Sequence, residues 1–240
     1  MSPSQLSRRT IGFVNAAHAL DHYVLLIYPT AVLAIAADRG LTYSELIGLS
    51  TGAFVAFGLF SLPVGWLVDR VGRRNLLGVF FIGIGVTCLL LAAAHSRWQF
   101  AAGLAVLGLF ASIYHPVGST MLVSHADRLG RALGRNGVCG NMGAAFAEMI
   151  SAALASLAGW QAAFLVPGAV ALIVGTAFLL LVPGDGDTVR KARQETAALN
   201  PVARPAATAI AYGVAIIAGG FTFNMTTIAL PKLIDGQFGA

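Results

Sequence analysis

Charge is scarce in this sequence: only 10% of its 240 residues are Asp, Glu, Lys or Arg, whereas 57% are apolar. Soluble domains carry about a quarter charged residues, so this composition cannot supply a surface that faces water. The apolar residues come in uncharged blocks, and a helix needs about 20 such residues to cross a bilayer. The blocks cover residues 46–68, 75–96, 98–126, 149–184 and 205–231. The sequence therefore predicts an all-α, polytopic membrane protein.

Lysine and cysteine are also rare, and each shortage excludes a class of function. Neither lysine, Lys191 or Lys232, follows a glycine, whereas the P-loop of an ATPase requires a Gly-Lys pair. The two cysteines, Cys88 and Cys139, lie within apolar segments, so no disulfide framework or thiolate metal site is indicated. The basic residues lie in short loops between apolar blocks, which argues against a nucleic-acid partner. No cofactor and no metal are implied.

The apolar blocks predict seven membrane-spanning helices. The block 149–184 is too long for one helix, and the Gly-Trp-Gln sequence that begins at Gly159 divides it. The expected helices cover residues 11–37, 45–68, 75–94, 97–124, 136–157, 162–182 and 206–230. This pattern gives a six-helix bundle over 1–183, a charged linker over 184–204, and the start of an incomplete second bundle over 205–240.

The distribution of basic residues predicts the orientation in the membrane. If the N-terminus is cytoplasmic, 12 of the 15 lysine and arginine residues fall on the inner side, as the positive-inside rule requires. The outer side then keeps Arg39, Arg97 and Lys232. Three of the inner arginines form a basic loop before the fifth helix, at positions 128, 131 and 135. We expect the linker to be cytoplasmic and the C-terminus to lie outside.

A charged, glycine-spaced loop separates the second and third expected helices. It reads G-W-L-V-D-R-V-G-R-R from Gly65 to Arg74. Gly65 permits close approach to a neighbouring helix, and Gly72 permits a tight turn. The carboxylate of Asp69 can face the positive end of a helix, and the arginines can meet acidic groups or lipid phosphates. The motif residues are Gly65, Asp69, Arg70, Gly72, Arg73 and Arg74.

This loop matches the G-x-L-x-D-R-x-G-R-R/K signature of the major facilitator superfamily, which the whole chain resembles. The resemblance implies the N-terminal half of a twelve-helix transporter plus one helix of the second half. We therefore expect a fragment or half-transporter, with the missing bundle supplied by a longer parent or by a second chain. By the same resemblance, Asp69 and Arg73 bind groups of that second bundle and have no partner in this chain.

Two further segments resemble one branch of the superfamily. The I-Y-H-P-V-G sequence from Ile113, with G-W and F-L-V-P-G around the sixth helix, is similar to the fosmidomycin-resistance branch of drug exporters. The fifth helix departs from the antiporter signature because it lacks a Gly-Pro pair and carries Gly137, Gly140 and Gly143 instead.

Five ionisable residues lie within the predicted spans, where each costs about 3 kcal/mol and usually faces a cavity or a partner. His18, Asp21 and His22 share one face of the first helix. His115 and Glu148 lie at similar depths on the fourth and fifth helices, near the midplane, where such transporters bind substrates and coupling ions. We predict that these five residues form the substrate and proton-coupling site.

A purely structural role for these residues remains an alternative. His18 or His22 can pair with Asp21 within one helical turn. His115 can restore hydrogen bonding near Ser112, whose carbonyl loses its usual donor because Pro116 has no N–H.

The favoured function is secondary active transport of a small organic solute across a bacterial inner membrane. We expect coupling to protons, and drug efflux is one expected activity; the partners are the bilayer, the solute and protons. No enzyme activity is expected. One alternative is an intramembrane serine protease, since Gly48-Leu-Ser50-Thr-Gly52 matches G-x-S-x-G, although that motif normally needs a strand-to-helix turn. Another is a non-transporting remnant that needs a partner half.

Overall fold

The computed structural model describes residues 3–184 and seven later positions, 206–207, 210–211, 213–214 and 218. The chain separates into two units, Met1–Val189 and Arg190–Ala240. The seven described positions of the second unit are helical. The expected linker after residue 184 and most of the helix expected over 206–230 lie outside the described residues.

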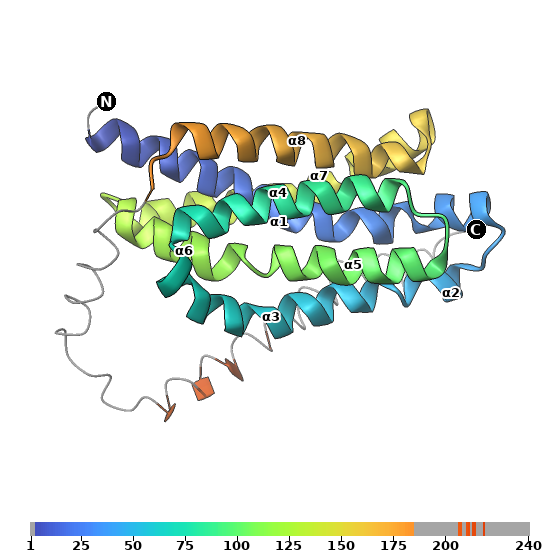
Figure 1. Cartoon of the computed structure of the whole chain (residues 1–240), viewed down its shortest axis with the longest axis horizontal. Helices are drawn as coiled ribbons and strands as arrows, with labels where there is room; N and C mark the ends of the chain where they lie inside the picture. Colours follow the sequence, from blue (N-terminus) through green and yellow to red (C-terminus); the bar gives the residue numbers. More distant parts are fainter. Residues whose placement is uncertain (1–2, 185–205, 208–209, 212, 215–217, 219–240) are drawn as a thin grey trace. The chain divides into compact units, whose positions relative to one another are not determined.

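The described part of the first unit is helical throughout, with short connections (Figure 1). Its helices are α1 (Pro3–Arg39), α2 (Tyr43–Ile47), α3 (Ser50–Val71), α4 (Arg73–Ala92), α5 (Arg97–Ala111), α6 (Tyr114–His125), α7 (Leu129–Ala158) and α8 (Trp160–Leu181). Six stretches of the described chain are long and apolar enough to cross a membrane. They match the first six expected helices in order, and the predicted all-α membrane bundle is confirmed.

Two helices begin earlier than predicted. α1 begins at Pro3, and α7 begins at Leu129, so Arg131 and Arg135 lie in the first turns of α7 rather than in a loop. The predicted basic loop was therefore too long, and only Arg128 of its three arginines precedes the helix. Apolar runs mark the part of a helix that is buried in lipid, whereas the backbone hydrogen bonds continue into the aqueous layer.

The second span is interrupted between α2 and α3. Thr42 and Glu45 start α2 with reciprocal hydrogen bonds: the Glu45 carboxylate accepts from the Thr42 N–H at 2.9 Å, and the Thr42 hydroxyl accepts from the Glu45 N–H at 3.4 Å. The helix stops at Gly48 and resumes at Ser50, where the Ser50 hydroxyl donates to the Ile47 carbonyl at 2.6 Å. This side chain therefore stabilises the turn between the two helices.

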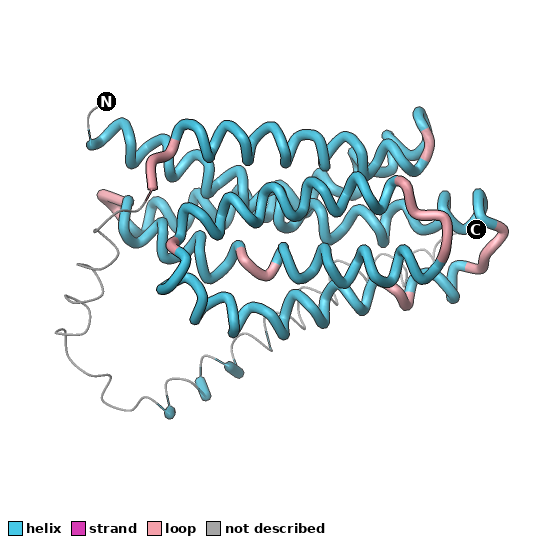
Figure 2. The backbone as a smooth tube through the Cα atoms, viewed as in Figure 1, coloured by secondary structure: helices cyan, strands magenta, loops and turns pink. Residues whose placement is uncertain are grey.

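The fourth span is interrupted between α5 and α6, and Figure 2 shows the short loop between them. Pro116 has no N–H to offer to the carbonyl of Ser112, so the regular helical pattern cannot continue there. The Ser112 hydroxyl donates to the Leu109 carbonyl at 2.6 Å on the other side of the break. The interruption places Tyr114 and His115 at the start of α6.

Two pairs of helices, α1 with α7 and α4 with α8, form the largest contacts of the bundle (Figure 1). Glycines allow each pair to pack closely. A Cβ atom at Gly143 of α7 would overlap the backbone of Ala19 in α1, and one at Gly168 of α8 would lie 3.1 Å from the Gly85 carbonyl oxygen in α4. Small residues at helix contacts are the usual means of close packing in membranes.

The spans differ in how much of their surface the bundle covers. In the most apolar stretch of the span Tyr43–Val68 only 17% is buried, and in Leu129–Ala158 only 22%, compared with 61% in Arg73–Ala92. Large apolar side chains are exposed on these two spans, among them Leu59, Leu62, Phe146 and Met149. These faces must meet lipid or another protein surface.

Candidate functional site

Three histidines from two helices come together inside the bundle. His18 and His22 of α1 and His115 of α6 each place a ring nitrogen within 4.8 Å of the others. Asp21 of α1 joins them, since its Oδ2 atom lies 3.4 Å from Nε2 of His115. The structure thus gathers four of the five predicted site residues into one group, called here the histidine cluster: His18, Asp21, His22 and His115.

Hydrogen bonds determine which nitrogen of His18 carries hydrogen. Its Nδ1 atom lies 2.7 Å from the backbone carbonyl oxygen of Asn136, and a carbonyl only accepts, so Nδ1 is the donor. In the neutral ring, Nε2 of His18 then carries the lone pair. Nε2 of His22 lies 3.1 Å from it and donates the hydrogen between the two rings. The lone pair of His18 therefore points toward His22.

Asn136 of α7 connects three helices beside the histidine cluster. Its side-chain oxygen accepts from the Tyr114 hydroxyl of α6 at 3.0 Å, and its amide donates to the Asn15 side-chain oxygen of α1 at 3.0 Å. Tyr114 also stacks on His18, with ring centres 4.7 Å apart. Sequence reasoning missed Tyr114 and Asn136. The sequence did offer a signal for Asn136, because this polar residue lies on the face of α7 that also carries Gly140 and Gly143.

Asp21 is buried, with a side chain that is 1% exposed. Within the described part of the chain, neither of its carboxylate oxygens accepts a hydrogen bond. The expected pairing with His18 or His22 within one turn does not form. Asp21 is turned by about 60° around α1 from His18, because 3.6 residues make one turn, and so it faces α6 and His115. A buried carboxylate with so few partners is costly and is typical of functional sites in membranes.

Glu148 lies outside the histidine cluster. The buried stripe of α7 includes Gly143, Ala147 and Ser151, and Ser151 donates to the Tyr23 hydroxyl at 3.2 Å. Glu148 follows Ala147 by one residue, so its side chain leaves this stripe and is exposed. Among the residues that the structure describes, it forms no hydrogen bond or ion pair. Its face of α7 is the one that the bundle leaves uncovered.

The glycine-spaced loop between α3 and α4 forms the tight turn that was predicted. Gly72 connects the helices with a φ of 89°, a conformation that favours glycine, and its N–H donates to the Val68 carbonyl at 3.1 Å. Arg74 donates to the Val182 carbonyl at 2.8 Å and to the carbonyl of Leu179, at the end of α8. An arginine on the last carbonyls of a helix stabilises that helix end.

Arg73 does not behave as expected. It donates to the Ser124 hydroxyl at 2.8 Å and to the Thr120 carbonyl at 3.3 Å, both on α6. The prediction that Arg73 has no partner in this chain is therefore wrong. The reason is geometric: the turn at Gly72 places the first residue of α4 beside the C-terminal end of α6, which the sequence order does not show.

Gly65 and Arg70 of the loop motif lie on the exposed face of α3. The Arg70 guanidinium lies over the Trp66 ring, 3.4 Å from its centre. A Cβ atom at Gly65 would meet nothing within 4 Å, so the close helix neighbour expected there is not among the described residues. The side chain of Asp69 lies outside the described atoms.

Comparison with known proteins gives the family. The profile described as Major Facilitator Superfamily matches residues 11–239. The chain belongs to this superfamily. A relative in Escherichia coli strain K12, the membrane sensor protein UhpC, is 27% identical over 162 residues, which are 66% of this chain and 36% of UhpC. The multidrug resistance protein MdtG of Serratia proteamaculans is 33% identical over 142 residues, covering 56% of this chain and 34% of MdtG.

A solved structure of a transporter shares this fold. The crystal structure of the POT family transporter PepTSo matches with a TM-score of 0.60 and 24% identity, over 72% of this chain and 37% of that one. This major facilitator chain thus spans a little over a third of the length of UhpC and of PepTSo. The family and the six apolar helices together make it a multi-pass membrane protein.

Superfamily membership also bears on Ser50, the candidate nucleophile of the protease alternative. Its hydroxyl donates to the Ile47 carbonyl in the turn between α2 and α3, which is a structural role. The matched family is one of transporters, so the proposed protease function receives no support.

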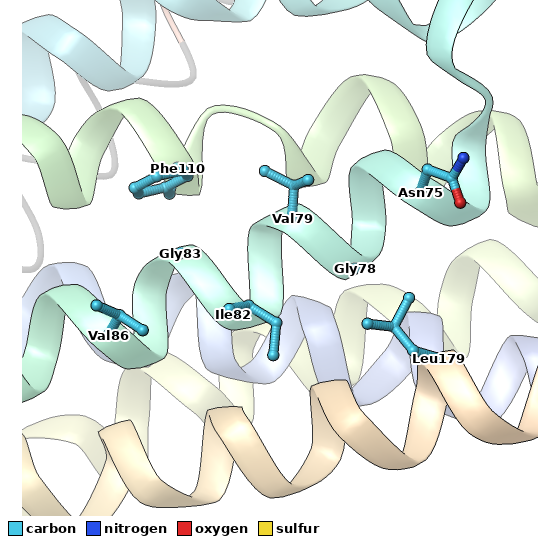
Figure 3. A pocket seen from close by; sticks show the side chains of 8 residues that line it. All are labelled: Asn75, Gly78, Val79, Ile82, Gly83, Val86, Phe110 and Leu179. Carbon is cyan, nitrogen blue, oxygen red and sulfur yellow. The ribbon is translucent and has the colours of Figure 1, made fainter.

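The major facilitator bundle also carries an apolar groove between α4, α5 and α8, with a volume of about 440 Å³ (Figure 3). Asn75 lies at one end of it and Val86 at the other. Its lining residues are Asn75, Gly78, Val79, Ile82, Gly83, Val86, Phe110 and Leu179. None of them is ionisable, so the groove suits hydrocarbon rather than a charged solute.

Proposed function

We propose that this chain forms the first bundle of a secondary active transporter that moves a small organic solute across a bacterial inner membrane, coupled to protons. The observation that carries the proposal is the histidine cluster, where a buried carboxylate and three imidazoles meet between α1 and α6. Ionisable groups inside a membrane bundle mark the paths of substrates and ions. The names of the relatives, one a multidrug resistance protein and one a POT family transporter, support transport.

A second bundle completes the proposed transporter. Alternating access requires two bundles that move about a shared site near the midplane. The uncovered faces of α3 and α7 are suitable surfaces for that contact, and the relatives are almost three times as long as the matched segment. In this proposal the chain 1–183 is the first bundle, 184–204 is the cytoplasmic linker, and 205–240 begins the second bundle, which a longer parent or a second chain supplies.

Two carboxylates carry the coupling proton in this proposal. Asp21 lies inside the first bundle beside His115, and Glu148 lies on the face of α7 that would meet the second bundle. The histidines line the way to Asp21, since the His115 side chain is 46% exposed. The solute binds next to them. Drug export in the manner of the fosmidomycin-resistance branch is the activity that the I-Y-H-P-V-G sequence from Ile113 supports best.

Transport driven by a pH gradient tests this function. We expect Asp21→Asn and Glu148→Gln, each placed in a full-length version, to abolish accumulation or expulsion of substrate by reconstituted vesicles. Exchange of substrate without a gradient should survive because the shape of the site is kept. Asp127→Asn is the matched control, since Asp127 is exposed between α6 and α7. Normal rates in both site variants would refute the proton role and leave the cluster with a structural one.

The proposed orientation has its own test. Single cysteines at Gly40 and Gly130, in a background without Cys88 and Cys139, lie at opposite ends of the bundle in this topology. An impermeant maleimide added to sealed cells should label the cysteine at Gly40 and not the one at Gly130. Labelling at Gly130 would reverse the proposed topology.

A further inference from the structure

We propose that His18, His22 and His115 form a binding site for one divalent transition-metal ion of the zinc, cobalt and nickel class. The sequence alone implied no metal, because the third histidine is about a hundred residues from the first two. The inference concerns the first bundle by itself and does not rest on the proposed transport activity.

The spacing of the nitrogens fits such an ion. His18 and His22 are four residues apart on α1, the spacing that puts two imidazoles on one side of a helix for a shared metal. Tetrahedral zinc has Zn–N distances near 2.0–2.1 Å, so its ligand nitrogens lie about 3.4 Å apart. The Nε2 atoms of His18 and His22 are 3.1 Å apart, and the ion takes the place of the hydrogen between them when His22 adopts the tautomer that carries its hydrogen on Nδ1. The His115 nitrogen lies within 4.8 Å of both, so its ring moves closer when the ion binds.

The groups around the histidines supply the outer shell of a metal site. Metal-binding histidines generally donate their second ring N–H to a backbone carbonyl or a carboxylate. His18 donates from Nδ1 to the Asn136 carbonyl at 2.7 Å, which leaves Nε2 as its ligand atom. The Asp21 carboxylate lies 3.4 Å from the His115 ring. That carboxylate accepts no hydrogen bond in the described chain, so it is available to the His115 N–H and to the charge of the ion.

Access and ligand type narrow the class of ion. The His115 side chain is 46% exposed, so an ion can reach the cluster, and a fourth position is left for water. Imidazole nitrogens suit zinc, nickel, cobalt and copper, whereas magnesium and calcium prefer oxygen ligands. A bound ion would join α1 to α6 across the break that precedes Tyr114.

Titration of the purified chain with Co²⁺ tests the proposal, since tetrahedral Co²⁺ absorbs visible light strongly. We expect one equivalent to bind to the tag-free chain in detergent at neutral pH, Zn²⁺ to displace it, and Mg²⁺ to have no effect. His22→Gln and His115→Gln should each weaken binding by about tenfold or more, and Asp21→Asn by about 10- to 100-fold, the usual effect of an outer-shell change. His95→Gln and His125→Gln are matched controls, because these histidines lie outside the cluster.

The outcomes are distinguishable from misfolding and from the transport proposal. A thermal melt shows whether each variant is folded. If a glutamine variant is unfolded, the wild-type chain still tests the site, because Co²⁺ should raise its Tm and Mg²⁺ should not. Failure of Co²⁺ to bind, or an equal loss in His95→Gln and His22→Gln, would overturn the site. Transport coupled to protons can fail in the full-length protein while the spectral change persists, so each proposal stands or falls separately.

Discussion

The two best-packed helix pairs of the bundle use the same small residues but differ in their polar groups. Between α4 and α8, Gly85 and Gly168 face each other, and the buried Thr87 donates to the Gly83 carbonyl of its own helix at 2.7 Å. Between α1 and α7, Gly143 faces Ala19 in the same way, yet polar side chains also bond from helix to helix. Apart from the hydrogen bonds of Arg74 to the end of α8, the described contact between α4 and α8 is made by glycines and apolar side chains such as Phe81 and Phe178. Polar side chains in the middle of the membrane are therefore not required to pack two helices of this bundle.

The ionisable groups near α1 lower the stability of the bundle, so their presence suggests a role other than packing. An intramembrane carboxylate such as Asp21 destabilises a bundle unless something compensates for it. The α4–α8 pair shows that the same chain can build a helix contact without that cost. This contrast supports the proposed binding role of the histidine cluster, and removal of its ionisable groups should affect binding and transport more than folding.

The largest loss of stability is expected from a substitution that disrupts the α1–α7 contact itself. A Cβ atom at Gly143 would overlap the Ala19 backbone, which cannot move without shifting α1, whereas one at Gly85 would overlap the flexible Leu172 side chain and lie 3.0 Å from the Gly168 carbonyl oxygen. We expect Gly143→Ala to lower the free energy of unfolding by about 2–3 kcal/mol and Gly85→Ala by less. Gly137→Ala is the control on α7, because nothing lies within 4 Å of that position.

Thermal and denaturant unfolding in detergent measure these three variants. Gly137→Ala should be neutral or stabilising by up to about 1 kcal/mol, since alanine is the better helix former. A loss in Gly137→Ala as large as that in Gly143→Ala would show that the close approach to Ala19 does not hold the pair together.

The next effect comes from the polar connection around Asn136. Asn136→Ala removes the bonds to the buried Tyr114 and to the half-buried Asn15 beside the histidine cluster. We expect a loss of about 1–2 kcal/mol in unfolding free energy, at the upper end for interhelical hydrogen bonds in membranes. Asn141→Ala, on the exposed side of α7, should be neutral.

A double-mutant cycle sharpens this prediction. Tyr114→Phe removes only the hydroxyl that donates to Asn136, so its effect should disappear in the Asn136→Ala background. Fully additive effects would mean that the 3.0 Å hydrogen bond contributes nothing to the contact between α6 and α7.

Asp21 should affect stability less than Asn136 does. Asp21→Asn removes a charge that accepts no hydrogen bond in the described chain, so we expect an unchanged or raised Tm. Asp38→Asn is the matched control, because Asp38 accepts from the Trp160 ring N–H at 3.0 Å and pairs with Arg39 at 3.3 Å. That change should cost about 1 kcal/mol. A large loss in Asp21→Asn would indicate a structural aspartate and would weaken the proposed coupling role.

Most of the bundle was predictable from the sequence, because each span is an apolar run with little or no charge, and charge, glycine or proline separates the spans. Gly159 was identified as an interruption, and it lies between α7 and α8 with a φ of 85°. The break between α5 and α6 was not predicted, because the loss of the hydrogen bond to Ser112 at Pro116 was recognised but the span 97–124 was expected to be one helix. The starts of α1 and α7 were placed too late, since their first turns are polar and carry no membrane signal.

The candidate site was predictable in composition but not in its contacts. Residues 18, 21 and 22 share a helix, so their proximity follows from helical spacing, whereas their meeting with His115 depends on how α6 packs against α1. Asn136 was invisible for the same reason: its role depends on Tyr114 and Asn15, which lie on two other helices. Periodicity determines which face a residue occupies, but tertiary packing determines its neighbour.

The smallest change in stability is expected from a substitution in the α4–α8 pair. Thr87 is buried in α4, and its hydroxyl bonds to the carbonyl of Gly83 in the same helix, a carbonyl that the regular backbone pattern already supplies with a donor. Thr87→Val keeps the shape and removes a hydrogen bond that joins no second helix. We expect a change in unfolding free energy of less than about 0.5 kcal/mol, the size usual for a substitution that breaks no contact between elements. A loss comparable to that of Asn136→Ala would mean that the middle of the α4–α8 contact also depends on a polar group, and the contrast between the two helix pairs would no longer support the proposed site.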